Sequence, residues 1–373
     1  MTGAPSSSFE LALTNPDFKF PQIWRTNFAV DQRLPWGFTN TTEFIYNKDV
    51  NGVYYINANL PAANATFSGA DARPRWTAGN RIHSFVANAV VLKNQNVGKS
   101  WNLATSLDRR FGSNFVKVAY SYGQSKNTVD AGSIAFGSWN NNQHAGDPNN
   151  PGVSYSPTGR AGHRFFATGT FGKNFFSFGR SSISLFYELR NVGVDSYTFS
   201  GDINGDGGTS NDLLYVHRNQ SEMNFQTYTT GGRTYTSAQQ AAAWDAYISQ
   251  DTYLSKRRGQ YAQRGGMLLP LVNRIDVGLA QDIFTNIRGR RNSLQIRADI
   301  LNAGNLINSD WGVGQRLVNR QPLLVVSGQQ ADAQGQMQYR LRAVGNELMS
   351  KSLESTAFLN DVYRFQIMLR YQF

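Results

Sequence analysis

The chain of 373 residues contains no cysteine, which excludes a disulfide scaffold, a thiolate metal site and a cysteine nucleophile. It has only four histidines, and no two of them have the HExxH spacing of zinc proteases. Long apolar runs are missing too. The longest cover a few residues, such as Met267 to Val272, whereas a membrane-spanning helix needs about 20. The first residues, MTGAPSSSFE, lack the charged and apolar regions of a signal peptide, so none is predicted.

Charged residues are also scarce, at 16%, while aromatic residues reach 13% and glycine numbers 35. Disordered chains have the opposite composition, so we expect a folded protein. Without an apolar helix, two main classes remain: a large soluble β-protein and an outer-membrane β-barrel. The net charge of +11 suggests an anionic partner. However, the sequence shows no basic helix and no recognition motif for nucleic acid, so no nucleic-acid partner is predicted.

Apolar and polar residues alternate along much of the chain. Successive side chains of a strand point to opposite faces, so alternation predicts strands with one apolar and one polar face. The alternation is cleanest at the end, where the apolar positions are Tyr363, Phe365, Ile367, Leu369, Tyr371 and Phe373. Nine long strands are predicted, at about residues 22–34, 37–57, 99–111, 114–127, 161–173, 180–200, 271–284, 291–306 and 361–373. All eleven prolines fall outside these spans, as expected for strands within a sheet.

The connections between these strands alternate in length. Short turns are expected at residues 34–37, 111–115, 173–179 and 285–291, and long loops at 58–98, 128–160, 201–270 and 307–360. Antiparallel strands joined in this way place all short turns at one end and all long loops at the other, as in outer-membrane barrels. Aromatic residues gather at the short-turn ends, which predicts an aromatic girdle at a membrane interface.

The predicted strand count is odd, whereas single-chain bacterial barrels have even numbers of strands. The first and last predicted strands both run toward the short-turn end, so they cannot pair in antiparallel order. We therefore expect an all-β fold that forms the C-terminal part of a larger transmembrane barrel. In this interpretation residues 1–21 are a loop segment leading into the first strand, and residues 22–373 are the barrel portion.

Charged residues of the strands share the polar face, which lines the lumen of a barrel. Their mixed signs predict ion pairs that fill a polar lumen rather than an ion-selective pore. No catalytic pair of carboxylates and no GxSxG nucleophile motif is found, so we predict no catalytic residues and no enzyme activity.

The segment GDINGDGGTSNDLLYV at 201–216 is the sharpest local motif. Asp202, Asn204 and Asp206, followed by Gly207, match the first half of an EF-hand calcium loop. The second half departs from it, because Asp212 stands one place before the position where the loop needs a glutamate. No cofactor is predicted apart from this candidate calcium ion. The alternative is a Gly/Asp/Asn turn cluster held by side-chain-to-backbone hydrogen bonds.

Residues 236–248 predict a short helix that Ser237 could cap, with Trp244 on its apolar stripe. The helix either packs on the outer loops or acts as a lid over a ligand. Segment 128–160 is rich in Asn, Gly and Pro and contains Trp139. Tryptophan and asparagine on exposed loops suit saccharides, although turn chemistry explains the asparagines equally well. No ligand-binding residue is assigned, but the candidate loops are those that contain Trp139 and Trp244.

Several stretches resemble the C-terminal barrel half of TonB-dependent outer-membrane transporters, especially the Oar-like group. They are GDINGDGGTSNDLLYV at 201–216, NRIDVGLAQDI at 273–283, LQIRADILNAGNLINSDWG at 294–312, YRFQIMLRYQF at 363–373 and the hairpin at 32–60. The resemblance implies a 22-stranded barrel with an N-terminal plug and a TonB box, which imports bulky nutrients with energy from the inner membrane. Neither the plug nor the TonB box is found in this sequence.

The resemblance further implies that the apolar positions of residues 363–373 form the signal read by the barrel-assembly machinery. The expected partners are outer-membrane lipid, the assembly machinery, an unidentified nutrient (saccharide, peptide or metal chelate) and the TonB complex through a plug. The expected location is the outer membrane of a Gram-negative bacterium. Two alternatives stay open: a passive porin-like barrel, and a soluble all-β carbohydrate-binding or adhesion protein.

Overall fold

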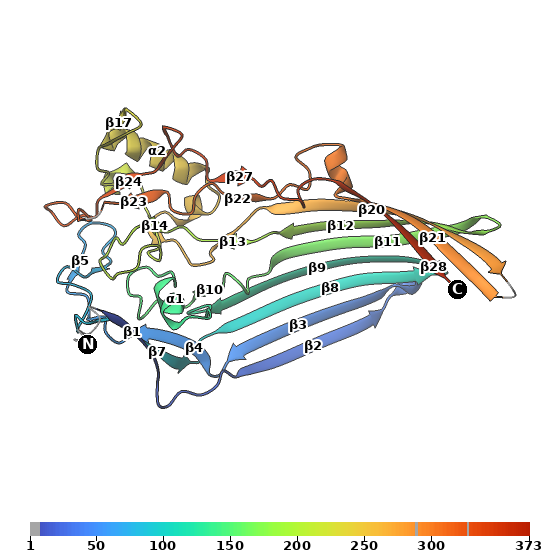
Figure 1. The fold of residues 1–373 in the computed structure, drawn as a ribbon, viewed down its shortest axis with the longest axis horizontal. Helices are drawn as coiled ribbons and strands as arrows, with labels where there is room; N and C mark the ends of the chain where they lie inside the picture. Colours follow the sequence, from blue (N-terminus) through green and yellow to red (C-terminus); the bar gives the residue numbers. More distant parts are fainter. Residues whose placement is uncertain (1–7, 288–289, 327) are drawn as a thin grey trace, which may run out of the picture.

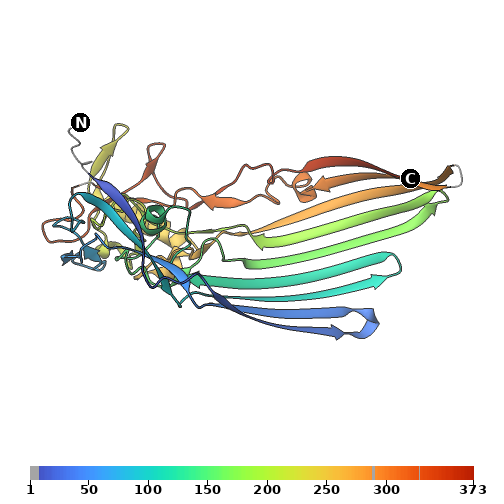
Figure 2. The ribbon, with the colours of Figure 1, turned by 60° about the horizontal axis from the view of Figure 1, so that its bottom comes forward.

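One long antiparallel sheet dominates the molecule (Figures 1 and 2). The computed structural model describes residues 8–287, 290–326 and 328–373. In this part of the chain the nine predicted strands are confirmed, each paired with its neighbour in chain order. They are β2 (Ile23–Arg33), β3 (Thr39–Asp49), β8 (Lys99–Phe111), β9 (Asn114–Asn127), β11 (Gly162–Phe176), β12 (Gly179–Asn191), β20 (Leu271–Ile287), β21 (Arg290–Leu301) and β28 (Arg364–Gln372).

Three of the predicted strands are too long, and the predicted N-terminal loop contains a strand. The prediction 37–57 joins β3 to β4 (Gly52–Asn57), but the chain bends after Asp49, where the N–H groups of Val50 and Asn51 both donate to the carbonyl of Gln22. β4 instead pairs with β7 (Val86–Gln95), which also pairs in parallel with β1 (Phe9–Thr14) inside the segment 1–21. The predictions 180–200 and 291–306 overrun β12 and β21, which end at Asn191 and Leu301. Residues 1–7 lie outside the described residues.

The predicted asymmetry of the connections is confirmed. Short turns and the C-terminus lie at one end of the sheet, and the long connections lie at the other (Figure 1). The turn predicted at 285–291 contains residues 288 and 289, which lie outside the described residues. β2 pairs with β3 and β28 pairs with β21, and within the described residues β2 and β28 have no further partner strand. Both edge strands run toward the short-turn end, as predicted (Figure 1).

The long connections fold into a separate body, here called the loop layer: the described residues of 50–98, 128–161, 192–270 and 302–363. It contains the helices α1 (Ala135–Asn140) and α2 (Ser237–Gln250) and the 3-10 turns η2 (Gln220–Glu222), η3 (Leu254–Arg257) and η4 (Ala303–Leu306). A further 3-10 turn, η1 (Pro35–Gly37), forms the hairpin connection between β2 and β3. Its short strands are β5 (Ala65–Thr66), β6 (Pro74–Arg75), β10 (Ser154–Tyr155), β13 (Val194–Asp195), β14 (Phe199–Ser200), β15 (Tyr215–Val216), β16 (Tyr228–Thr230), β17 (Arg233–Tyr235), β18 (Gln260–Tyr261), β19 (Met267–Leu268), β22 (Gln315–Leu317), β23 (Leu323–Val325), β24 (Tyr339–Leu341), β25 (Ala343–Val344), β26 (Glu347–Leu348) and β27 (Leu353–Ser355).

The buried hydrophobic core lies in the loop layer. Its main cluster brings together side chains from distant loops, among them Phe67, Tyr197, Leu214, Trp244 and Leu341. A smaller cluster consists of Leu60, Trp76, Val90 and Trp139. The loop layer therefore folds around its own apolar core. No helix among the described residues combines the length and the apolar character needed to cross a membrane.

Candidate functional site

The apolar side chains of the long sheet form rows across one of its faces. The register pairs Phe44 with Leu103, Leu185 with Val277 and Ala298 with Ile367, and all of them follow the same phase of the alternation. These side chains stay exposed, for example Leu279 at 54% and Ile367 at 77%. A water-soluble protein rarely exposes a continuous apolar surface of this size, so this face suits lipid contact.

The opposite phase carries charge, as predicted. On this face Glu188 contacts two arginines: Arg164, with Nε 2.8 Å from Oε1, and Arg190, with Nε 3.3 Å from Oε2. Further along the sheet, Arg297 lies 2.9 Å from Asp299. Such pairs give a polar surface with both signs of charge, which is the composition expected of a barrel lumen.

Large aromatic side chains mark the short-turn end. Exposed rings there include Trp36, Phe175, Phe176, Phe178 and Phe373. At the same end, the Arg109 guanidinium lies over the rings of Phe38 and Phe111, at 5.5 and 5.6 Å from their centroids. Aromatic and arginine side chains of this kind are favourable at the level of lipid headgroups.

The last strand, β28, has its apolar side chains on the exposed apolar face. In the register Phe365 pairs with Ile300, Leu369 with Ile296 and Tyr371 with Leu294. The Tyr371 hydroxyl donates to Asn292 Oδ1 at 2.7 Å, which fixes the end of the strand next to β21. Four of the predicted signal residues lie on this surface within β28: Phe365, Ile367, Leu369 and Tyr371. The other two, Tyr363 and Phe373, flank the strand, and their rings contact those of Phe365 and Tyr371.

The loop predicted to bind calcium uses several of its oxygens to hold its own turn. Asp202 accepts hydrogen bonds from the N–H groups of Gly205 (2.7 Å) and Gly207 (2.9 Å). Asn204 Oδ1 accepts from the N–H of Asp206 at 3.1 Å. These bonds are the ones expected of the alternative turn cluster. Calcium binding itself stays a prediction.

The structure brings Asp206 and Asp212 together with His144, a residue that the sequence motif does not include. All three residues are buried, and a ligand atom of each lies within 4.8 Å of the others. The backbone positions His144 beside the loop: its N–H donates to Asn211 O (2.9 Å) and its carbonyl accepts from Leu213 N–H (2.8 Å). His144 comes from the 128–160 loop, so no local spacing could have revealed it.

Arg73 supplies a buried positive charge at the side of this cluster. Its guanidinium makes two hydrogen bonds to Asp71, of 3.0 and 2.9 Å, and one of 3.2 Å to Asp212 Oδ1. Burial and the neighbouring Asp206 nevertheless raise the pKa of Asp212 to about 7, against the effect of Arg73 and His144. The pKa of Asp202 is also raised, first by burial and then by Asp206.

Both candidate ligand-binding tryptophans lie inside the loop layer. Trp139 is 3% exposed and donates to Asn149 Oδ1 at 2.9 Å, and Trp244 is fully buried and donates to His217 Nδ1 at 3.1 Å. Neither indole is on the surface in this structure.

The predicted helix is confirmed as α2, but its N-cap is Thr236 instead of Ser237, because Thr236 and Gln239 form a reciprocal capping box.

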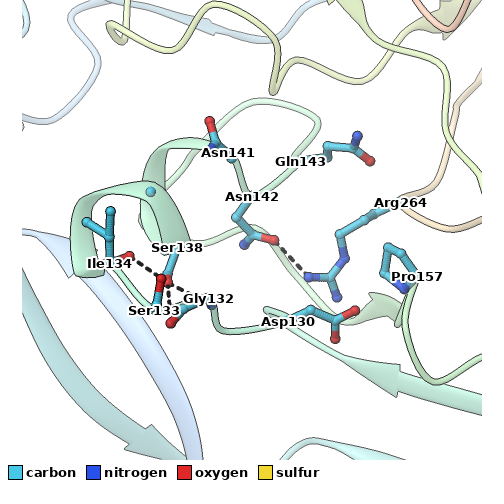
Figure 3. Close-up of a pocket in the computed structure, with 11 residues that line it drawn as sticks. Asp130, Gly132, Ser133, Ile134, Ser138, Asn141, Asn142, Gln143, Pro157 and Arg264 are labelled. Atoms are coloured by element: carbon cyan, nitrogen blue, oxygen red, sulfur yellow. Dashed lines mark hydrogen bonds between the residues drawn. The ribbon is translucent and has the colours of Figure 1, made fainter.

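The 128–160 loop also lines an open pocket of about 420 Å³ (Figure 3). Its charged residues, Asp130 and Arg264, are already engaged by protein groups. Arg264 donates to Thr128 O and Asn142 Oδ1, both at 2.7 Å, and burial lowers its pKa to about 10. By contrast, two buried atoms of the lining residues have no hydrogen-bond partner in the protein: the acceptor Gln143 Oε1 and the donor Arg264 Nε. The pocket therefore suits a polar ligand that carries both donors and acceptors.

The fold and its surfaces define a transmembrane β-barrel protein: long antiparallel strands with an exposed apolar face, a charged opposite face and aromatic residues at one boundary. Comparison with known families agrees, because the model of the outer membrane beta barrel domain family matches residues 1–313. The chain belongs to this family, and its location is the outer membrane of a Gram-negative bacterium. No curated protein and no solved structure matches the chain.

Proposed function

We propose that this chain is the barrel portion of a TonB-dependent transporter of the Oar-like group, which takes up a bulky nutrient such as a saccharide, peptide or metal chelate. The observation that carries the proposal is the odd number of long strands along the sheet. β2 and β28, the two edges, run in the same direction. An antiparallel barrel would need further strands between them, since unpaired edges are not stable in lipid. In a 22-stranded barrel these nine strands would be the last nine.

The loop layer supports a receptor more than a simple pore. Its buried core joins the three longest connections, and its surface bears the pocket of Figure 3, with unpaired polar groups. Loops held by a rigid barrel are where transporters of this kind would bind their ligand. In this proposal the TonB complex acts through a plug, and the assembly machinery recognises β28.

The DNA upstream of residue 1 provides the first test. We expect the reading frame to continue into further strands, a plug domain and a TonB box. A stop codon directly upstream, or a secretory leader joined directly to residue 1, would contradict the proposal.

Planar bilayers provide the second test, because they separate a transporter from a passive porin. We expect the protein with its plug to give no steady conductance, and the same protein with the plug deleted to give large open channels. Steady conductance in the presence of the plug would instead support the porin.

A further inference from the structure

Beside Asp206, the buried residues His144 and Asp212 carry polar atoms that the protein itself leaves without partners. His144 is fully buried, and neither of its ring nitrogens has a hydrogen-bond partner; Nε2 lies 3.2 Å from Asp206 Oδ2. Asp212 is also fully buried, and its Oδ2 has no partner although Oδ1 contacts Arg73. A buried polar atom without a partner destabilises the folded protein, and a buried charged group without one does so more strongly. Something other than the protein is needed to satisfy these atoms.

The negative charge of the carboxylates around the cluster favours binding of a cation. Asp202, Asp206 and Asp212 lie in one loop. Arg73 contacts this loop through Asp212, but it also forms an ion pair with Asp71, so its single positive charge serves two carboxylates. A divalent cation placed among these groups would offset the excess negative charge and accept the free lone pairs.

We propose that His144, Asp206 and Asp212 form a binding site for a divalent transition-metal ion, with Zn²⁺ as the reference ion. One imidazole and two carboxylates are ligands typical of Zn²⁺, whereas Ca²⁺ is bound by oxygen atoms alone. The 3.2 Å between His144 Nε2 and Asp206 Oδ2 also fits. Two ligands of a tetrahedral ion at about 2.0–2.1 Å from the metal are separated by roughly 3.3 Å.

The ion would join two loops that are far apart in the sequence. His144 belongs to the 128–160 loop and follows Asn142 and Gln143, which line the pocket of Figure 3. Asp206 and Asp212 belong to the 201–216 loop. Metal binding would therefore hold one wall of the pocket against the core of the loop layer. This site does not depend on the transport function proposed above.

Metal binding can be measured on the purified, detergent-solubilised protein after dialysis against a chelator. We expect isothermal titration with Zn²⁺ to show one tight site, and Co²⁺ in its place to give the visible absorption bands of a tetrahedral ion with a nitrogen ligand. His144→Asn should weaken Zn²⁺ binding by at least about 100-fold. The matched control is His83→Asn, which changes an exposed histidine outside the cluster and should leave the affinity unchanged.

Hydrogen exchange provides a readout that does not depend on the variant's folding. On the wild-type protein, Zn²⁺ should slow exchange of the N–H groups of His144 and Leu213 relative to the chelated protein. Three results would overturn the proposal: no Zn²⁺ site in the folded wild type, tight binding of Ca²⁺ with none of Zn²⁺ or Co²⁺, or unchanged Zn²⁺ affinity in a folded His144→Asn variant.

Discussion

At the scale of single residues, the loop layer depends on buried polar groups whose charges are tightly specified. His217 is one of them. Trp244 Nε1 donates to its Nδ1 (3.1 Å), and its Nε2 lies 2.6 Å from the Tyr339 hydroxyl. A ring that accepts at Nδ1 is neutral, and burial lowers the pKa of His217 to about 4.

The low pKa of His217 predicts that acid weakens the loop layer. An exposed histidine in the unfolded chain has a pKa of about 6.5, so the unfolded state takes up the proton first as the pH falls. The stabilising effect of neutral His217 is complete above pH 6.5 and is lost between pH 6.5 and 4, by roughly 3 kcal/mol. Hydrogen exchange at residues 215–217 and Trp244 fluorescence, followed against pH, would measure this loss.

His217→Gln is the variant that isolates this effect, because glutamine can replace both hydrogen bonds without titrating. It should flatten the pH dependence between 6.5 and 4. The wild type and the variant have to be compared, because both also contain Asp212. The raised pKa of Asp212 has the opposite effect on stability: it favours the folded state as the pH falls below about 7. Equal pH dependence in the two proteins would count against the assignment.

Arg73 leads to a second prediction at this scale. It is buried between Asp71 and Asp212, and its guanidinium lies 5.2 Å from the ring centroids of Phe199 and Tyr261. Arg73→Met leaves buried carboxylates without their partner, so we expect the loop layer to lose about 3–5 kcal/mol. Arg316→Met removes an exposed pair with Glu354 and should cost less than about 1 kcal/mol. Limited proteolysis of residues 197–216 compares the two variants; similar cleavage rates would contradict the prediction.

At the scale of elements, the two faces of each strand should respond differently to charge. Val118 and Ala119 are neighbours on β9, but Val118 pairs with Ala167 on the apolar face, whereas Ala119 pairs with Phe166 on the charged face. Val118→Lys places an ammonium toward lipid, which costs about 2–4 kcal/mol near the centre of a bilayer. Ala119→Lys should be tolerated.

Urea unfolding in lipid vesicles measures this difference, followed by the change in gel mobility between the folded and the unfolded protein. The midpoint should fall for Val118→Lys and stay near the wild-type value for Ala119→Lys. The reverse order would mean that the faces are assigned the wrong way round.

The long strands could be predicted because their signal is local. For residues 99–111 and 114–127 the predicted bounds coincide with β8 and β9, since alternation begins and ends with each strand. Prediction of strand ends from alternation fails where the alternation continues across a bend, as at Val50 and Asn51 between β3 and β4. Period two reports which face a side chain occupies but not which strand it pairs with.

The loop layer could not be predicted in this way. Apart from β4 and β7, its strands are only two or three residues long, and its contacts join distant segments, such as the pair Arg73 and Asp212, 139 residues apart. The metal cluster shows the same limit. The motif at 201–216 pointed to Asp206 and Asp212, whereas His144 enters from another loop and has no sequence signal of its own.

At the scale of the whole molecule, closure of the long sheet into a barrel depends on its two edge strands, β2 and β28. β2 and β28 run in the same direction, so direct closure would need a parallel seam in an otherwise antiparallel barrel. Barrels with an odd number of strands do exist, as the 19-stranded mitochondrial barrel shows. With nine strands, however, the lumen would be barely wide enough for the side chains on the charged face.

Engineered cysteines can decide this point, because the chain has no cysteine of its own and therefore no background. The control pair is Phe44→Cys with Leu103→Cys, which are directly paired in the register of β3 and β8 and should form a disulfide in outer membranes. The test pairs combine Phe28→Cys on β2 with a cysteine on β28, at Phe365, Ile367 or Leu369 in turn. We expect no disulfide in any test pair, because further strands separate the two edges. A disulfide in one of them would show that the nine strands close by themselves, and the proposed large barrel would have to be abandoned.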